Sequence, residues 1–526
     1  MSAGKTAAYD GNITNYLFER CLAPEMANHP AFVVGETIYS FAQIHERTNR
    51  VANLLKAMKV AVGDRVMMGV IDGPDFPAVF LGAIRMGAVA VAINTYLKPT
   101  DYEYYVNDSG AKVLFIDHSL VPIIEEIRAN LTNVQRIVVS GRKVEGYPFL
   151  DDLMAEHSAA AEVHPASGDD VAFLLYSSGS TGAPKGVVHT HAHIYWATEL
   201  FGLGIQGVRA GDIIQCPPKM FFAFGLGNQV YFPLRAGATV IVNPEPATPA
   251  RIWDLWLKHE PTIVMSVPTL YAGMLKIAET EIGQERTRRA LRRLRYGVSG
   301  GEGLPAPLYE RWQEFAGLEI LDGVGTTEMT HMFILNHPGR SVPGSCGRVV
   351  DGYRAVVVDE DGRELPTGEV GNLLVCGPSA MVEYWNKPEK TAATMRDGGV
   401  LTGDKARFDE DGNIYLVGRS DDMLRVGGVW VSPLEVETAL TRHPAVLECA
   451  VIGFPDENSM IKPKAFVVLG DKTSANQDRM EQELKEFCRS QLAHIKCPRW
   501  IVILPELPKA TTGKIQRFRL RQAESL

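Results

Sequence analysis

The first part of the chain alternates short apolar runs with amphipathic segments. Residues 66–71 and 89–93 are apolar runs typical of buried strands, and Asp75 with Pro77 opens a helical segment between them. This β-α-β rhythm predicts a mostly parallel sheet covered by helices.

The same rhythm continues further along the chain. Thr100 and Glu103 have the spacing of a capping box and predict that a short helix begins there, ahead of a strand at 113–116. Residues 171–274 repeat the alternation, which predicts a second α/β layer. The pattern describes a scaffold and by itself indicates no chemistry.

From about residue 344 the helical periodicity gives way to short strands separated by Asp-Gly turns. We expect strands at 356–358, 369–375 and 414–417, within a small β-rich part that covers about 344–420.

A compact α+β unit is predicted after this β-rich part. Ser432 and Glu435 form a capping box with proline at the first helical position. Strands are expected at 447–454, 464–469 and 500–504, with a long amphipathic helix at 477–493. We place the boundary at Asp421, which gives an N-terminal domain (1–420) and a small C-terminal domain (421–526).

Length and composition indicate a multidomain globular protein. The chain has 526 residues, of which 46% are hydrophobic and 22% charged, so more than one folding unit is expected. The net charge of -9 argues against a nucleic-acid binder. Anionic ligands would therefore be held by local cations and backbone dipoles.

Cysteine usage and the N-terminal sequence predict a cytoplasmic protein. Residues 1–15 lack the apolar core of a signal peptide, and no stretch has the length of a membrane span. The cysteines form no C-x-x-C pair and indicate reduced thiols: Cys21, Cys216, Cys346, Cys376, Cys449, Cys488 and Cys497.

The stretch 176–186 carries the clearest chemical signal. It follows an apolar run and contains three glycines, four serine or threonine hydroxyls and Lys185. Glycines let backbone N–H groups approach phosphate oxygens, and hydroxyls and a lysine add donors and charge. A Walker A loop is excluded because Lys185 lies between Pro184 and Gly186. The alternative is a flexible Gly/Ser surface loop.

This stretch, ending in Pro-Lys-Gly, resembles the phosphate loop of the acyl-adenylating superfamily, which includes acyl-CoA synthetases. Members join a carboxylate to the α-phosphate of ATP, release pyrophosphate, and transfer the acyl group to a thiol. The resemblance implies an ATP-binding loop made of Ser177, Ser178, Gly179, Ser180, Thr181, Gly182 and Lys185.

Two further stretches resemble the nucleotide-binding motifs of this superfamily. Residues 323–328 match the motif whose threonine, here Thr327, contacts the α-phosphate and whose glutamate, here Glu328, binds Mg²⁺. Val324 replaces the usual aromatic residue. Residues 299–303 resemble the adenine-binding wall, although a tight turn between strands explains the glycines equally well. The implied nucleotide contacts are Gly301, Glu302, Gly303, Asp322 and Gly323.

Two motifs nearer the C-terminus complete the resemblance. Asp404, in Thr402-Gly403-Asp404, and Arg419 correspond to ribose contacts, although a lone T-G-D is more often an ordinary turn. Lys514 corresponds to the lysine that stabilises the adenylation transition state, whereas a basic tail without this context is normally just solvated.

Acyl-CoA synthetases rotate the C-terminal domain between their two half-reactions. The resemblance implies that Asp421 is the hinge. It also implies that CoA passes a loop made of Arg425, Gly427, Gly428 and Trp430.

The acyl site resembles that of bacterial benzoate-CoA ligases. Phe222 and Phe224 would form a small apolar slot that favours an aromatic ring, although such a cluster is often plain core. His331 is otherwise a structural hydrogen bonder, and Thr330 stands where an aliphatic residue is expected, which leaves room for a substituted ring. The implied acyl contacts are Phe222, Ala223, Phe224, Gly225, Gly325, Thr330 and His331.

The predicted function is ATP-dependent ligation of an aromatic carboxylic acid to CoA, with Mg²⁺, by a monomer or homodimer. Its partners are small molecules, with neither nucleic acid nor membrane involved. A free-standing aryl acid adenylation enzyme that loads a carrier protein is the alternative. A regulatory adenylate-binding protein would have lost catalytic residues, but Lys185, Glu328, Asp404 and Lys514 are present.

Overall fold

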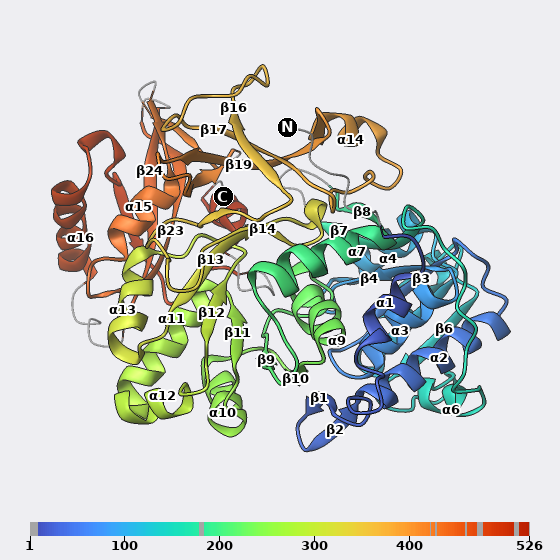
Figure 1. Ribbon diagram of the computed structural model, residues 1–526. Helices are drawn as coiled ribbons and strands as arrows, with labels where there is room; N and C mark the ends of the chain where they lie inside the picture. Colours follow the sequence, from blue (N-terminus) through green and yellow to red (C-terminus); the bar gives the residue numbers. More distant parts are fainter. Residues whose placement is uncertain are drawn as a thin grey trace.

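The computed structural model has the expected α/β architecture, with two helix-covered sheets, a β-rich part and a C-terminal unit (Figure 1). It describes residues 9–177, 183–420, 422–426, 429–457, 460–470, 477–509 and 515–524. Several predicted site residues lie outside these ranges: Ser178, Gly179, Ser180, Thr181, Gly182, Asp421, Gly427, Gly428 and Lys514.

A six-stranded sheet forms the N-terminal half and has the order β6-β5-β3-β4-β7-β8. All pairs are parallel except β7 with β8. Its strands are β3 (Arg65–Gly69), β4 (Val89–Ala92), β5 (Val113–Asp117), β6 (Arg136–Ser140), β7 (Val171–Ser177) and β8 (Lys185–Thr190). Helices α2 (Phe41–Ala57) and α3 (Asp75–Arg85) pack on one face, and α4 (Pro99–Ser109) and α5 (Val121–Ile127) on the other.

A nine-stranded sheet follows, with the order β15-β14-β13-β12-β11-β9-β10-β1-β2. Its strands are β1 (Pro30–Val34), β2 (Thr37–Ser40), β9 (Ile213–Gln215), β10 (Thr239–Val242), β11 (Ile263–Ser266), β12 (Tyr296–Ser299), β13 (Ile320–Gly325), β14 (Met332–Leu335) and β15 (Arg348–Val349). Helices α10 (Pro249–His259), α11 (Pro268–Ile277) and α13 (Ala306–Ala316) pack against β11–β13 around Trp253, Trp256 and Trp312.

The β-rich part lies across the top of Figure 1 as an antiparallel sheet. Its strands are β16 (Arg354–Val358), β17 (Gly371–Cys376), β18 (Met395–Arg396), β19 (Gly399–Phe408) and β20 (Ile414–Arg419). The sequence pattern did not predict β19, the longest of them. Because β19 contains Thr402-Gly403-Asp404, this motif lies in a strand and is not an ordinary turn.

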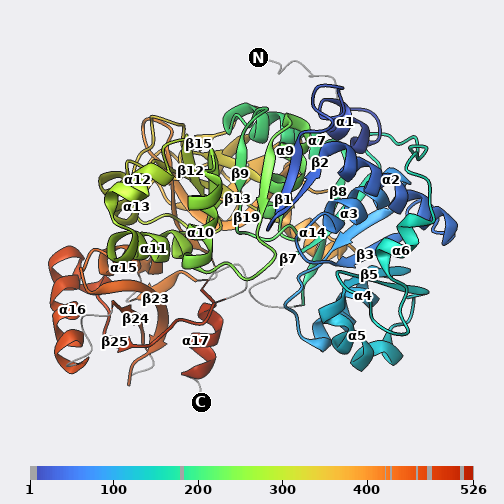
Figure 2. The same ribbon diagram turned by 90° about the horizontal axis from the view of Figure 1, so that it is seen from below.

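The C-terminal unit has its own three-stranded sheet, β23 (Val446–Pro455), β24 (Ile461–Leu469) and β25 (Trp500–Ile503). Helices α15 (Pro433–Leu440), α16 (Gln477–Gln491) and α17 (Arg517–Ala523) surround it. In Figure 2 this unit lies beside α11 and α13. The Ser432 half of the predicted capping box of α15 is confirmed, since the Ser432 hydroxyl accepts a hydrogen bond from the Glu435 amide at 3.1 Å, whereas the Glu435 carboxylate pairs with Lys496.

The predicted start of α4 is wrong by two residues. The helix begins at Pro99, with Lys98 as its N-cap residue, so Thr100 lies inside the first turn. Asp101 supplies the carboxylate that accepts from the Lys98 amide, at 3.3 Å. Proline at the first helical position sets the boundary here, ahead of the Thr-x-x-Glu pattern.

Candidate active site

The predicted phosphate loop joins two paired strands. Ser177 ends β7, Lys185 begins β8, and the two residues pair across this antiparallel ladder. Strand pairing fixes both ends of the loop, whereas a Walker A loop would run into a helix. The structure therefore agrees with the sequence-based rejection of a Walker A site.

Glu328 is held by hydroxyl groups from separate parts of the chain. Its Oε1 accepts from the Tyr384 hydroxyl at 2.7 Å and from Ser177 Oγ at 3.2 Å, and its Oε2 accepts from the Thr326 hydroxyl. These hydroxyl donors fix the orientation of the carboxylate. Hard carboxylate oxygens suit Mg²⁺, which also takes phosphate and water ligands. The described residues contain no cluster of three or more His, Cys, Asp or Glu side chains that could hold a metal by itself.

Lys185 lies next to this carboxylate. Its ammonium group is 4.0 Å from the centroid of the Tyr384 ring. Burial lowers the pKa of Lys185, while the charge of Glu328 acts in the opposite sense. Tyr384 thus contacts both charged groups. Its role could not be predicted from the sequence, because Tyr384 lies 56 positions from Glu328 and no motif surrounds it.

A buried polar network supports the turn that carries Thr327 and Glu328. His189 Nε2 lies 2.8 Å from the Thr327 carbonyl oxygen, and its Nδ1 lies 3.0 Å from Nδ1 of His193. Thr330 adopts a positive φ of 67° and donates to the Ser379 carbonyl at 2.9 Å. Burial lowers the pKa of His189 to about 4 and that of His193 to about 3, so both rings are neutral near pH 7.

The predicted adenine-binding wall follows β12 and lies beside β13. Gly301 has a φ of +87°, which favours glycine, and Glu302 and Gly303 line the cleft. Asp322 is buried under this wall and accepts from the Leu304 amide at 3.1 Å. Burial raises the pKa of Asp322 to about 7.

The two predicted ribose contacts lie side by side. Asp404 and Arg419 are cross-strand partners on β19 and β20, and Arg419 Nη1 donates to Asp404 Oδ1 at 3.1 Å. Both line the cleft, so a carboxylate and a guanidinium face the same space.

The predicted acyl residues separate into two groups. Phe222, Ala223, Phe224, Gly325 and His331 line the cleft. Gly225 instead packs against backbone, because a Cβ atom there would lie 2.0 Å from the Lys219 carbonyl oxygen. The hydroxyl of Thr330 is engaged by Ser379 and His189, which gives Thr330 a supporting position behind the site.

His331 is the polar group of this apolar region. Its ring lies among Phe201, Phe224 and Phe232, and its Nε2 lies 3.3 Å from Asn228 Nδ2. Burial lowers the pKa of His331 to about 3, so its ring is neutral. Its Nδ1 is buried without a hydrogen-bond partner within the described chain.

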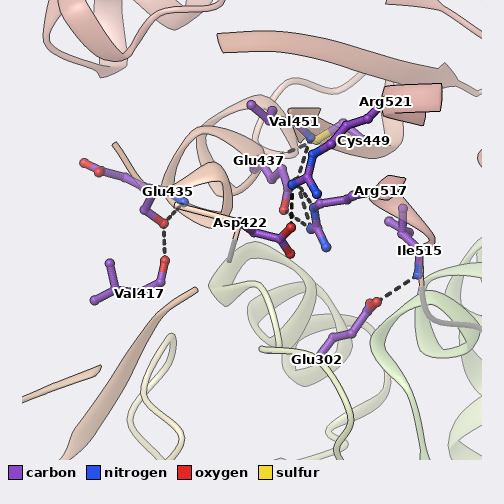
Figure 3. A network of polar contacts seen from close by, with 11 residues as sticks. Glu302, Val417, Asp422, Glu435, Glu437, Cys449, Val451, Ile515, Arg517 and Arg521 are labelled. Carbon is purple, nitrogen blue, oxygen red and sulfur yellow. Dashed lines mark hydrogen bonds and ion pairs between the residues drawn. The ribbon is translucent and has the colours of Figure 1, made fainter. Parts of the chain in front are cut away.

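One cleft of about 1950 Å³ connects these groups. Its lining extends from the phosphate-loop ends to the acyl residues and across to the C-terminal unit. Ile515, the residue that follows Lys514, donates its backbone N–H to Glu302 Oε1 at 3.0 Å (Figure 3). The structure therefore brings the end of the chain to the predicted adenine-binding wall.

The described part of the predicted CoA loop forms a separate ribbon. Arg425 and Trp430 are backbone partners on β21 (Leu424–Val426) and β22 (Val429–Val431). Arg425 is exposed and lies outside the lining of the cleft.

Comparison with known families supports the assignment that these motifs suggest. The family model described as AMP-binding enzyme matches residues 18–385, and the family model described as AMP-binding enzyme C-terminal domain matches residues 435–514. The chain belongs to the AMP-binding enzyme family. A benzoate-CoA ligase of Thauera aromatica is 43% identical to it over 514 residues, which cover 97% of this chain and 96% of the relative.

Solved structures of this enzyme family share the whole fold. The anthranilate CoA ligase AuaEII in complex with anthranoyl-AMP has a TM-score of 0.93 and 39% identity, covering 100% of this chain and 99% of that one. A benzoate CoA ligase from Burkholderia xenovorans LB400 has a TM-score of 0.89 and 38% identity, covering 97% and 99%. In the present chain, no helix among the described residues has the length and apolar character needed to cross a bilayer.

Proposed function

We propose that this AMP-binding enzyme is an aromatic carboxylic acid CoA ligase that forms an acyl-AMP intermediate. The observation that carries the proposal is the single cleft in which Lys185, Glu328 and the Asp404–Arg419 pair adjoin an apolar region with His331. A nucleotide and a small flat acid can occupy such a site together.

In the first step a carboxylate oxygen of the acid attacks the α-phosphorus of ATP. The bond from this phosphorus to the bridging oxygen breaks, and pyrophosphate leaves. Lys185 and Lys514 offset the phosphate charge, Thr327 contacts the α-phosphate, and Glu328 holds the Mg²⁺ that accompanies ATP. Asp404 and Arg419 hold the ribose, and the wall at residues 301–303 contacts adenine.

In the second step the CoA sulfur attacks the acyl carbonyl carbon. The bond from this carbon to the AMP oxygen breaks, AMP leaves, and the thiol proton passes to solvent. Arg425 and Trp430, with the glycines between them, guide the pantetheine arm after the C-terminal unit turns about Asp421.

The apolar groups in the acyl region favour an aromatic ring over a long chain. Phe222 and Phe224 flank the space, and the neutral ring of His331 supplies one hydrogen-bonding position. Benzoate and its hydroxyl- or amino-substituted forms are the substrate class. Mg²⁺, ATP and CoA complete the reactants.

The test is a panel of benzoate, hydroxybenzoates, aminobenzoates and cyclohexane carboxylate, with pyrophosphate and acyl-CoA measured separately. We expect both products with an aromatic acid, ATP and CoA. Lys514→Ala should slow pyrophosphate release about a hundredfold or more, because a preorganised cation is lost in the transition state. It should spare thioester formation from supplied acyl-AMP. Pyrophosphate release without any acyl-CoA would instead favour the carrier-loading enzyme.

A further inference from the structure

Glu302 contacts the residue that follows the predicted catalytic lysine. Its Oε1 accepts the Ile515 amide at 3.0 Å, and Ile515 is only 9% exposed (Figure 3). Glu302 belongs to the loop after β12, whereas Ile515 precedes α17. The hydrogen bond therefore joins the adenine-binding wall to the C-terminal segment.

The segment that Glu302 contacts is firmly fixed within the C-terminal unit. Arg517 Nη2 donates to Glu437 Oε2 at 2.8 Å, and Glu437 Oε1 also accepts the Val451 amide at 2.7 Å. One helical turn later, Arg521 Nη2 donates to Asp422 Oδ1 at 2.5 Å. Glu302 thus meets a segment that is tied to both α15 and β23, so a contact at Ile515 orients the whole unit.

An attraction between opposite charges and a close packing contact both join the adenine-binding wall to the C-terminal unit. Glu437 raises the pKa of the Arg517 guanidinium most, and Glu302 and Asp422 add to this effect. The wall also approaches α15, because a Cβ atom at Gly303 would lie 3.5 Å from Leu434 Cδ2. A negative side chain on the wall therefore faces a positive one on the C-terminal unit beside a close approach of the two surfaces.

We infer that Glu302 is a positioning residue that docks the C-terminal segment for the acid-activating step. The inference rests on the proposed function, in which Lys514, the residue before Ile515, serves that step. An adenine contact alone would not require a carboxylate at position 302, since glycines and backbone form the rest of the wall. The carboxylate supplies an acceptor for Ile515 and a counter-charge for Arg517.

The experiment measures the two half-reactions separately in three variants of Glu302. Single-turnover pyrophosphate release measures activation, and supplied benzoyl-AMP with CoA measures thioester formation. Glu302→Gln keeps an acceptor, Glu302→Ala removes it, and Glu302→Lys places a cation beside Arg517. We expect activation to fall in this order, with about a tenfold loss or more for Glu302→Ala, because a hydrogen bond to a charged group is removed.

At saturating benzoyl-AMP, thioester formation should fall by a much smaller factor than activation in all three variants, because both half-reactions use the adenine-binding wall but only activation uses the Ile515 contact; the remaining activity also reports an intact fold. Glu310→Gln, on an exposed face of α13, is the matched control and should change neither rate. Equal losses in both half-reactions, or a raised KM for ATP with an unchanged activation rate, would overturn the docking role. If wild-type enzyme activates no aromatic acid, the proposed function itself fails, which is a separate result.

Discussion

At the scale of single residues, the charge of Glu328 can be tested apart from its hydrogen bonds. Glu328→Gln keeps an oxygen that can accept from Tyr384 and Ser177 but removes the negative charge that Mg²⁺ needs. We expect pyrophosphate release to fall about 10²- to 10³-fold, the range for loss of a preorganised electrostatic group. The measurement is single-turnover activation at saturating ATP and Mg²⁺.

Tyr384→Phe is the companion variant for this site. It removes the hydroxyl donated to Glu328 but leaves a ring beneath Lys185. The loss should be smaller, about ten- to a hundredfold, because one hydrogen bond to a charged group is worth about 1.5–3 kcal/mol. Activation by Glu328→Gln at more than half the wild-type rate would contradict the role of this carboxylate.

At the scale of elements, the ion pair between α17 and α15 should stabilise the C-terminal unit. The side chains of Arg517 and Glu437 are 17% and 8% exposed. Arg517→Met would leave the Glu437 carboxylate buried without its cation, and we expect a loss of about 3–5 kcal/mol in the free energy of unfolding of this unit. Denaturant unfolding followed by hydrogen exchange in β23 and β24 would measure it.

The same helix supplies a control for this prediction. Glu435 of α15 pairs with Lys496 at 2.6 Å, where the two side chains are 43% and 28% exposed. Lys496→Met should cost no more than about 1 kcal/mol, because water screens the pair. The double variant Glu437→Gln/Arg517→Met should recover part of the loss. Similar effects of Arg517→Met and Lys496→Met would show that burial does not set the strength of the pair.

At the scale of the whole molecule, buried histidines should make the fold sensitive to acid. Burial lowers the pKa of five histidines to about 3 or 4, whereas the unfolded chain takes up their protons near pH 6.5. Each of these histidines therefore lowers the free energy of unfolding by about 2 kcal/mol between pH 7 and pH 5. The five are His45, His189, His191, His193 and His331.

Two buried carboxyl groups act in the opposite direction. Burial raises the pKa of Asp72 to about 6 and that of Asp322 to about 7, so the folded state binds their protons first as the pH falls. They offset part of the histidine effect, and we expect a net loss of a few kcal/mol from pH 7 to pH 5. Denaturant midpoints of the wild-type protein from pH 7 to pH 5 test this prediction. The His29→Gln variant, which changes an exposed histidine, is measured beside it as the control. A midpoint at pH 5 equal to or above that at pH 7 would contradict it.

Local patterns along the chain were enough to predict the family, the α/β class and most elements. Alternating apolar runs predicted β3, β4, β5 and β7 with their helices, and the Ser432 cap predicted the start of α15. Motifs of a few consecutive residues also identified Lys185, Glu328, Asp404 and Arg419. The domain boundary at Asp421, the cytoplasmic location and the monomeric or dimeric state stay predictions.

Which of these residues face one another depends on the packing of distant parts of the chain. Tyr384 joins Glu328 to Lys185, Thr330 points toward His189 and Ser379, and Glu302 contacts Ile515 across 213 positions of chain. Such contacts depend on how separate elements pack. A local pattern records the periodicity of its own strand or helix, but it holds no information on which distant backbone will lie opposite.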